Sequence, residues 1–261
     1  MKYWITGASS GIGQALAEQL AGQGHEVAVS ARSEASLQAL AARYPGQVQV
    51  FPTDTTDRQA LAHAGTQIRA RFEHLDVVVL NAGTCEYVDA ADWDSELFER
   101  VMRTNFQGTV NCIEQALPLL RAGRRIRGAR HRPVLAAVAS SAAYLALTRA
   151  EAYGASKAAV QYLMEGLRVD LWAEGIDVCV INPGFVDTPL TAVNDFPMPA
   201  MLSTEQAATL IRRGLERHRA VIDFPKRLTW PLRALRHLPP KWRARLLQPT
   251  VRKPDEGASP P

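Results

Sequence analysis

The chain has 261 residues, of which 47% are hydrophobic and 21% charged, and this composition excludes an intrinsically disordered protein. Three widely spaced cysteines and six histidines give neither a disulfide framework nor a metal-ligand pattern, so we expect no metal site. No apolar run approaches the roughly 20 residues that span a bilayer. We therefore expect a cytoplasmic protein, and a glycine-rich motif that begins at Thr6 leaves no room for a secretory signal.

The net charge of +4 is unevenly distributed along the chain. Residues 1–211 contain 17 Lys and Arg against 22 Asp and Glu, whereas residues 212–253 contain 13 against 2. The basic character is thus a property of the C-terminal segment.

Short apolar runs alternate with longer segments of helical period along the first 224 residues. The predicted strands are Lys2–Thr6, Glu26–Ala31, Gln47–Phe51, Asp76–Leu80, Pro133–Ala139, Ile176–Ile181 and Ala220–Phe224. The predicted helices are Ile12–Gln23, Ser33–Arg43, Asp57–Arg71, Asp94–Arg121, Tyr153–Ala173 and Ser203–Arg217. This alternation predicts an α/β fold with a doubly wound, parallel seven-stranded sheet and helices on both faces.

We expect a single domain over residues 1–225, a basic amphipathic helical extension over 226–253 and a disordered tail over 254–261. Six arginines lie between Arg121 and Arg132, and such a run is typical of a solvated loop, with a specific anion site as the alternative. Gly24 is expected to cap the first helix in a left-handed conformation. Ser203 and Gln206 form the pattern of a capping box.

A glycine-rich turn, Thr6–Gly13, lies directly after the first strand and opens the first helix. Gly7 would allow the tight turn, Gly11 would let the backbone approach a pyrophosphate, and Gly13 would permit close packing of helix on strand. The helix N-terminus offers unpaired N–H groups to phosphates. A plain tight turn is the alternative interpretation.

This glycine spacing, together with Asn81-Ala82-Gly83 after the fourth strand, resembles the short-chain dehydrogenase/reductase superfamily, whose members have a Rossmann fold. Further family motifs follow in order over residues 2–225: Asn105, Ser140, Tyr153-x-x-x-Lys157 and Asn182-Pro183-Gly184. One departure is Leu80, where the family commonly has Asn, and it affects strand packing more than chemistry.

Tyr153 and Lys157 are four residues apart, so both side chains share one helix face. A cationic neighbour lowers the pKa of a phenol, which favours acid–base catalysis; a surface Tyr beside a solvated Lys is the alternative. The resemblance implies that Tyr153 exchanges a proton with the substrate oxygen and that Ser140 hydrogen-bonds this oxygen, with Ser141 as the alternative serine. It also implies that Lys157 binds the nicotinamide ribose and that Asn105 holds a water in a proton relay.

The cofactor preference depends on the end of the second strand. Ala31 stands where a carboxylate would bind the ribose of NAD, and Arg32, whose guanidinium suits a phosphate, follows at once. We therefore expect NADP(H), with NAD(H) as the alternative cofactor. The alternative interpretation of Arg32 is an uninvolved surface arginine. Asp54 matches the family position that contacts adenine, or is an ordinary turn acid. The expected cofactor-binding residues are Gly7, Ser9, Ser10, Gly11, Ile12, Gly13, Arg32, Asp54, Asn81, Ala82, Gly83, Tyr153, Lys157, Pro183, Gly184, Val186 and Thr188.

The resemblance places a substrate lid at Pro189–Leu202, where Asp195 is the only charged residue. Its apolar side chains favour an apolar ketone or aldehyde and its alcohol, although its three prolines also suit a simple loop. The expected substrate-binding residues are Tyr144, Phe185, Phe196 and Met198.

Leucines and tryptophans are interspersed with basic residues over Lys226–Leu247. This segment could pack over the substrate entrance or a partner subunit, or lie on an anionic membrane surface. Nucleic-acid binding is not expected, because no recognition motif accompanies it. An apolar stripe on Tyr153–Ala173 (Val160, Leu163, Met164, Leu167 and Leu171) fits either a homodimer or homotetramer interface or the core of a monomer.

The sequence therefore predicts an NADP(H)-dependent oxidoreductase that uses Ser140, Tyr153 and Lys157. The alternative is an NADP(H)-binding sensor on the same fold with little or no turnover.

Overall fold

The structure is a computed structural model, and it describes residues 1–192, 194 and 196–248. The predicted tail over residues 254–261 and the last residues of the predicted extension, 249–253, lie outside the described residues. Within the described residues, no helix is long and apolar enough to cross a membrane.

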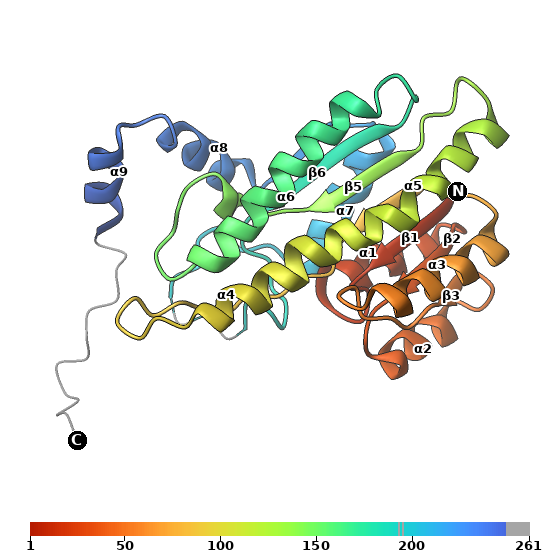
Figure 1. The fold of residues 1–261 in the computed structure, drawn as a ribbon, viewed down its shortest axis with the longest axis horizontal. Coiled ribbons are helices and arrows are strands. Elements are labelled where there is room, and N and C mark those ends of the chain that lie inside the picture. Colours follow the sequence, from red (N-terminus) through yellow and green to blue (C-terminus); the bar gives the residue numbers. More distant parts are fainter. Residues whose placement is uncertain (193, 195, 249–261) are drawn as a thin grey trace.

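Seven parallel strands form one sheet in the order β3-β2-β1-β4-β5-β6-β7 (Figure 1). The strands are β1 (Lys2–Thr6), β2 (Glu26–Ser30), β3 (Val48–Val50), β4 (Val77–Leu80), β5 (Val134–Val138), β6 (Asp177–Pro183) and β7 (Val221–Phe224). The predicted doubly wound α/β fold is confirmed. The strand order reverses between β1 and β4, and in sheets of this kind ligands bind at that point, beyond the carboxyl ends of the strands.

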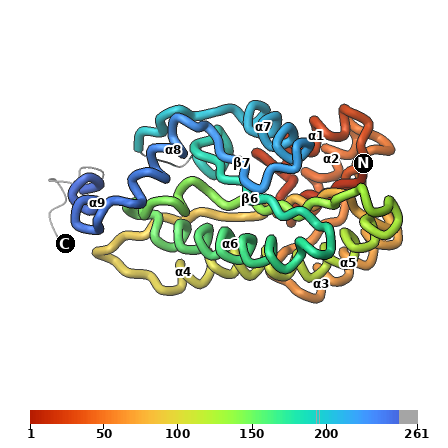
Figure 2. Tube along the Cα trace, turned by 90° about the horizontal axis from the view of Figure 1, so that it is seen from above, coloured from red at the N-terminus to blue at the C-terminus, as the bar shows by residue number. Residues whose placement is uncertain are grey.

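Helices cover both faces of the sheet, and each face has its own apolar core (Figure 2). On one face lie α1 (Gly11–Gly22), α2 (Glu34–Arg43) and α7 (Thr204–Glu216); on the other lie α3 (Arg58–Phe72), α5 (Gly108–Arg127) and α6 (Glu151–Asp170). Within β1, Tyr3 and Ile5 point into the first core and Trp4 into the second, as the alternation of a strand requires. Both predicted helix caps are present: Gly24 has a φ of +80°, and Ser203 and Gln206 form the capping box.

The predicted helix over Asp94–Arg121 differs from the observed structure. It consists of α4 (Ser95–Met102), a π-helical turn (Arg103–Gln107) and α5, which continues to Arg127. The prediction of a solvated loop over Arg121–Arg132 is therefore wrong for its first half, since the helix ends only before Gly128, whose φ is +83°.

Three of these arginines have ion-pair partners that are distant in the sequence. Arg121 pairs with Glu174, Arg127 with Asp76 and Arg132 with Asp177, at 2.6 to 2.9 Å. Because the acids come from other elements, a local charge count could not reveal this pairing.

The C-terminal segment forms two short helices, α8 (Lys226–Leu235) and α9 (Pro240–Leu247). Figures 1 and 2 show α9 at the end of the molecule opposite the N-terminus. The boundary that we propose at residue 225 lies between β7 and α8.

Two histidines surround the fully buried Asp76 at the edge of the sheet where the strands begin. His131 Nε2 lies 3.0 Å and His74 Nε2 3.9 Å from Asp76 Oδ1, and burial lowers the pKa of both histidines from the ordinary 6.5. The unfolded chain then binds protons before the native state does as the pH falls through 6.5, so these histidines destabilise the fold at lower pH.

We predict that the free energy of unfolding falls less between pH 7.5 and pH 5.5 (about one unit either side of an ordinary histidine pKa) in the His74→Gln/His131→Gln variant than in the wild type. Urea unfolding at both pH values measures this difference. His63→Gln, an exposed histidine in α3, is the control and should behave like the wild type. An equal pH dependence in wild type and double variant would contradict the assignment.

Candidate active site

The turn after β1 has space only for glycine at two of its positions. A Cβ on Gly7 would lie 2.8 Å from Ala82 Cα, and a Cβ on Gly13 would lie 2.4 Å from the carbonyl oxygen of Gly7. Gly7 and Gly11 also have positive φ angles of 65° and 57°. The backbone of this turn is thus packed closely against the segment after β4, and Gly7 and Gly11 line a cavity on its other side.

Hydrogen bonds join this turn to the segment after β4. The Asn81 side chain donates to the carbonyl oxygens of Thr6 and Gly7 at 3.1 and 3.0 Å. The Thr6 hydroxyl in turn accepts from the backbone N–H groups of Asn81 and Ala82 at 3.0 and 3.2 Å. These bonds fix the two segments that flank the point where the strand order reverses.

A cavity of about 820 Å³ extends along the carboxyl ends of the strands. It collects most of the predicted cofactor residues, together with Ser140: Gly7, Ser9, Ser10, Gly11, Ile12, Arg32, Asp54, Asn81, Ala82, Gly83, Tyr153, Lys157, Pro183, Gly184, Val186 and Thr188. Gly13 lies behind the turn rather than in the wall. The cavity also contains Arg100, Arg103 and Thr104, which the sequence patterns did not identify because they occur in no motif.

Three predicted catalytic side chains converge at one end of this cavity. Ser140 lies two residues after the end of β5, and its side chain forms a hydrogen bond with Tyr153. Tyr153 and Lys157 are one turn apart in α6, and Lys157 Nζ lies 5.8 Å from the centroid of the Tyr153 ring. Lys157 is only 4% exposed and donates to the carbonyl oxygen of Val138 at 2.9 Å. Its ammonium is therefore held in a fixed position.

Burial dominates the acid–base properties of this pair. It raises the pKa of Tyr153 to about 12, opposed by the hydrogen bond from Ser140, and it lowers the pKa of Lys157 to about 8. The predicted lowering of the Tyr153 pKa by Lys157 is not found. The reason is that removal of both groups from water penalises both charged forms, an effect that sequence spacing does not show.

Asn105 lies in the π-helical turn between α4 and α5 and is almost fully buried. Its side-chain amide donates to the Thr84 carbonyl oxygen and to the Ser156 hydroxyl, each at 2.9 Å, and its oxygen accepts from the Thr84 N–H at 2.7 Å. Asn105 thereby connects the segment after β4 to α6. A Cβ on Gly83 would lie 3.1 Å from Asn105 Oδ1 and 3.2 Å from Lys157 Nζ, so these two side chains meet behind Gly83.

Polar side chains line the far end of the cavity. Asp54 accepts from the backbone N–H and the hydroxyl of Thr56, both at 2.8 Å, so it is a turn acid as well as a lining residue. Arg32 is exposed, and within the described part of the chain it forms no ion pair. The Thr188 backbone N–H donates to the Thr191 hydroxyl at 3.0 Å, which orders the start of the predicted lid.

The predicted substrate residues do not line this cavity in the described structure. The Tyr144 hydroxyl donates to Asp223 at 2.6 Å and accepts from Asn182 at 2.7 Å, so it belongs to a buried polar network. The Phe196 ring packs edge-on against those of Phe185 and Tyr87, at centroid distances of 6.0 and 5.8 Å.

Met198, a predicted substrate residue, lies beside the aromatic cluster of Tyr87, Phe185 and Phe196, and its Sδ accepts a hydrogen bond from the Asn194 side chain at 3.2 Å. Two residues of this region, Cys85 and Tyr87, were missed by the sequence analysis. Cys85 lies close enough to Tyr153 and Lys157 to interact with them electrostatically, and burial raises its pKa to about 11. Neither Cys85 nor Tyr87 belongs to a motif, and only their position four and six residues after Asn81 hinted at the site.

Comparisons with known proteins agree with this geometry. The model of the short chain dehydrogenase family matches residues 2–196. An uncharacterized oxidoreductase of Myxococcus xanthus is 37% identical over 238 residues, which are 90% of this chain and 91% of that protein. An uncharacterized oxidoreductase of Staphylococcus saprophyticus is 31% identical over 199 residues, 74% of this chain and 81% of that protein. The chain belongs to the short-chain dehydrogenase family and is an oxidoreductase.

Solved structures with the same fold include two that contain a nicotinamide cofactor. A 3-ketoacyl-(acyl-carrier-protein) reductase from Brucella melitensis in complex with NADH has a TM-score of 0.77 at 23% identity, covering 84% of this chain and 94% of that one. An alcohol dehydrogenase from Thermococcus sibiricus in complex with 5-hydroxy-NADP has a TM-score of 0.71 at 24% identity, covering 82% and 90%.

We predict that Gly13→Ala lowers the free energy of unfolding by about 1–3 kcal/mol, because its Cβ would overlap the Gly7 carbonyl oxygen and force the turn to shift. The matched control is Gly22→Ala in the same helix, whose Cβ would make an ordinary contact at 3.8 Å with Tyr44. The control should be neutral or more stable, since alanine favours the helix. Urea unfolding of both variants measures the difference, and equal stabilities would refute the close contact.

Proposed function

We propose that the chain is a cytoplasmic NADP(H)-dependent oxidoreductase that interconverts an apolar ketone or aldehyde and its alcohol. The observation that carries this proposal is the convergence of Ser140, Tyr153 and Lys157 in the wall of the cavity that also contains the glycine turn. Catalysis of this kind requires a proton donor and a cofactor in one crevice, and the fold brings both sets of residues there.

The residues around the turn fit a dinucleotide. No side chain caps the first turn of α1, and a Cβ at Gly7 would fill the space beside Ala82. The N–H groups of Ser10, Gly11 and Ile12 would therefore bind the pyrophosphate, aided by the helix dipole. The bound cofactor would supply or accept the hydride.

Tyr153 would exchange the proton with the substrate oxygen. With a pKa of about 12 it is a protonated phenol at neutral pH, which is the form that reduction of a carbonyl consumes. Ser140 would donate a second hydrogen bond to the same oxygen, where negative charge develops. Lys157, held by Val138, would bind the nicotinamide ribose, and Asn105 would support the proton relay behind Gly83.

An apolar substrate is supported by the aromatic side chains beside the proposed lid. Phe185, Phe196 and Tyr87 pack together there, and Met198 lies next to them. We propose that these side chains contact the substrate after the lid closes. Tyr144 would contribute to substrate binding by positioning adjacent residues, because its hydroxyl already donates a hydrogen bond to Asp223.

A homodimer or homotetramer is a further part of this proposal. The predicted stripe on α6 faces the core at Val160 and Met164, whereas Tyr162, Val169 and Trp172 are exposed in or just beyond the same helix. These exposed apolar side chains are the ones that a second subunit would cover.

We predict that Tyr153→Phe lowers turnover by about 10²- to 10⁴-fold, because the proton donor is lost. Consumption of NADPH with a panel of aliphatic, aromatic and steroid-like ketones measures turnover, and quenching of protein fluorescence measures cofactor affinity, which should be nearly unchanged. The control Tyr162→Phe removes a hydroxyl from the exposed side of the same helix and should keep full activity. Unchanged turnover in Tyr153→Phe would refute the mechanism, and cofactor binding without turnover of any substrate by the wild type would favour the sensor.

We predict that Arg32→Ala weakens NADPH binding about tenfold, the loss of one charge-assisted hydrogen bond to the 2′-phosphate, while NADH binding stays unchanged. Arg69→Ala removes an exposed cation from α3, outside the cavity, and should change neither affinity. Fluorescence titration with both cofactors measures the ratio. Equal losses for NADPH and NADH would refute recognition of the phosphate by Arg32.

A further inference from the structure

Residues 226–248, which we call the C-terminal surface segment, concentrate positive charge outside the catalytic cavity. The segment contains seven Lys and Arg residues and no Asp or Glu. In the portion of the chain that the structure describes, Arg233 is the member of this set with an ion pair, to Asp223 at 2.9 Å. The other cations are left to define a positively charged surface, which attracts anions.

Large apolar side chains are exposed among these cations. Trp230 and Trp242 are each 63% exposed, and Leu246 is 52% exposed. Trp242 and Leu246 are four residues apart in α9 and so share one face of this helix, whereas Arg243 and Leu247, about 100° further round the helix, are half-buried. In α8, Trp230 is likewise exposed while Leu228 and the other leucines of the helix are half-buried.

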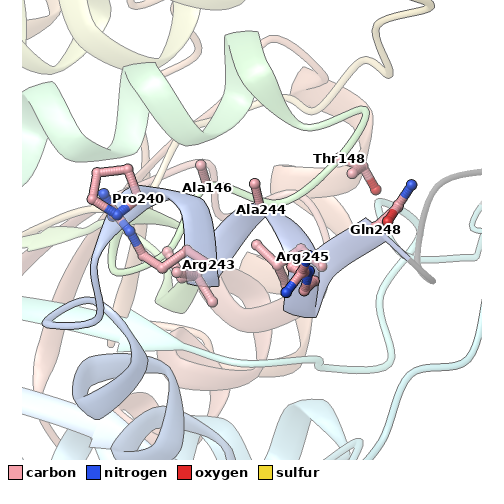
Figure 3. Close-up of a pocket in the computed structure, with 9 residues that line it drawn as sticks. Ala146, Thr148, Pro240, Arg243, Ala244, Arg245 and Gln248 are labelled. Carbon is pink, nitrogen blue, oxygen red and sulfur yellow. The ribbon is translucent and has the colours of Figure 1, made fainter.

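The contact between α9 and the rest of the protein is loose. None of the α9 residues is buried, and an open, mainly apolar hollow of about 730 Å³ lies between this helix and the loop that contains Ala146 and Thr148 (Figure 3). Arg243 and Arg245 line the same hollow. Exposed apolar side chains are unfavourable in water. Together with the neighbouring cations they are favourable at an interface between charged groups and an apolar phase.

The C-terminal surface segment lies on the same side of the molecule as the catalytic cavity. Figures 1 and 2 show α9 at the end of the molecule opposite the N-terminus, where β1 begins, and therefore on the side toward which the parallel strands run. The catalytic cavity lies at the carboxyl ends of the same strands. The loop beside α9 follows Ser140 by only five to eight residues.

We propose that the C-terminal surface segment docks this protein on an anionic lipid bilayer. Tryptophan indoles are suited to the headgroup region, where one end of the ring is wet and the other apolar, and lysine and arginine bind the anionic headgroups. Burial of the exposed Leu238 and Leu246 side chains in an apolar phase is favourable, and a nucleic acid does not provide such a phase. The proposal does not depend on the proposed reaction.

The test is co-sedimentation of the full chain with vesicles of phosphatidylcholine, with and without phosphatidylglycerol. We expect the protein to pellet with the anionic vesicles and to be released at high salt. Each removed cation should weaken binding about fivefold, corresponding to about 1 kcal/mol. The variant Arg236→Gln/Lys241→Gln/Arg245→Gln should thus bind about a hundredfold more weakly. Trp230→Ser/Trp242→Ser should also weaken binding.

The matched controls remove exposed side chains of the same types elsewhere. Arg69→Gln/Arg125→Gln/Arg130→Gln lies in α3, α5 and the following loop, and Trp93→Ser/Ile126→Ser lies just before α4 and in α5. Both controls should bind like the wild type, and circular dichroism should show all variants folded.

Three outcomes would overturn the proposal. The first is no pelleting, or equal pelleting of the segment variants and their controls. The second is tighter, salt-sensitive binding of a random single-stranded oligonucleotide that depends on the same cations. The third is a change of molecular mass in sedimentation equilibrium for the segment variants alone, which would show that a second copy of the chain covers this surface.

Discussion

The close approach of the turns after β1 and β4 is the constraint on which the cavity at the carboxyl ends of the strands depends. Gly7 and Gly13 allow the two segments to touch, and Asn81 holds them together by hydrogen bonds to the first turn. A side chain at either glycine would separate them. Because β1 and β4 are neighbours whose following connections lead to opposite sides of the sheet, their fixed ends leave a crevice between the connections.

The second constraint is the fixed position of the Lys157 ammonium in a poorly solvated part of the cavity wall. Lys157 is held by Val138 on one side, and Asn105 lies next to it behind Gly83. Burial makes the neutral forms of both Lys157 and Tyr153 more favourable than in water. A negative charge next to the Lys157 ammonium would interact with it through a medium of low dielectric constant, where the attraction is large.

The sequence predicted the fold well because the strands are buried on both faces. Runs such as Val77–Leu80 are short, apolar at every position and bounded by polar residues, which is typical of strands in a parallel sheet that is covered on both faces. The predicted residues of the cavity belong to family motifs, many of which follow a strand, whereas Arg100, Arg103 and Thr104 belong to no motif and were not predicted. The π-helical turn at Arg103–Gln107 was not predictable, because it arises from the packing of Asn105 against Thr84 and Ser156, which are distant in the sequence.

Electrostatic properties were the least predictable. The spacing of Tyr153 and Lys157 predicted that the ammonium lowers the pKa of the phenol, but it gave no measure of burial, which dominates the pKa of both groups. Likewise, Tyr144 looked available to a substrate until its hydroxyl was found bonded to Asp223 and Asn182, which lie on two other strands.

The polar network around Asp223 connects α8 to the sheet and to the loop that contains Tyr144. Arg233 neutralises the carboxylate that receives the Tyr144 hydroxyl, and its guanidinium also lies 5.3 Å from the Tyr144 ring centroid. A chain shortened before residue 226 would retain every strand and every family motif. It would nevertheless leave the Asp223 carboxylate, which accepts from Tyr144, without its Arg233 partner. A complete set of family motifs therefore does not ensure that the charges of the domain are balanced.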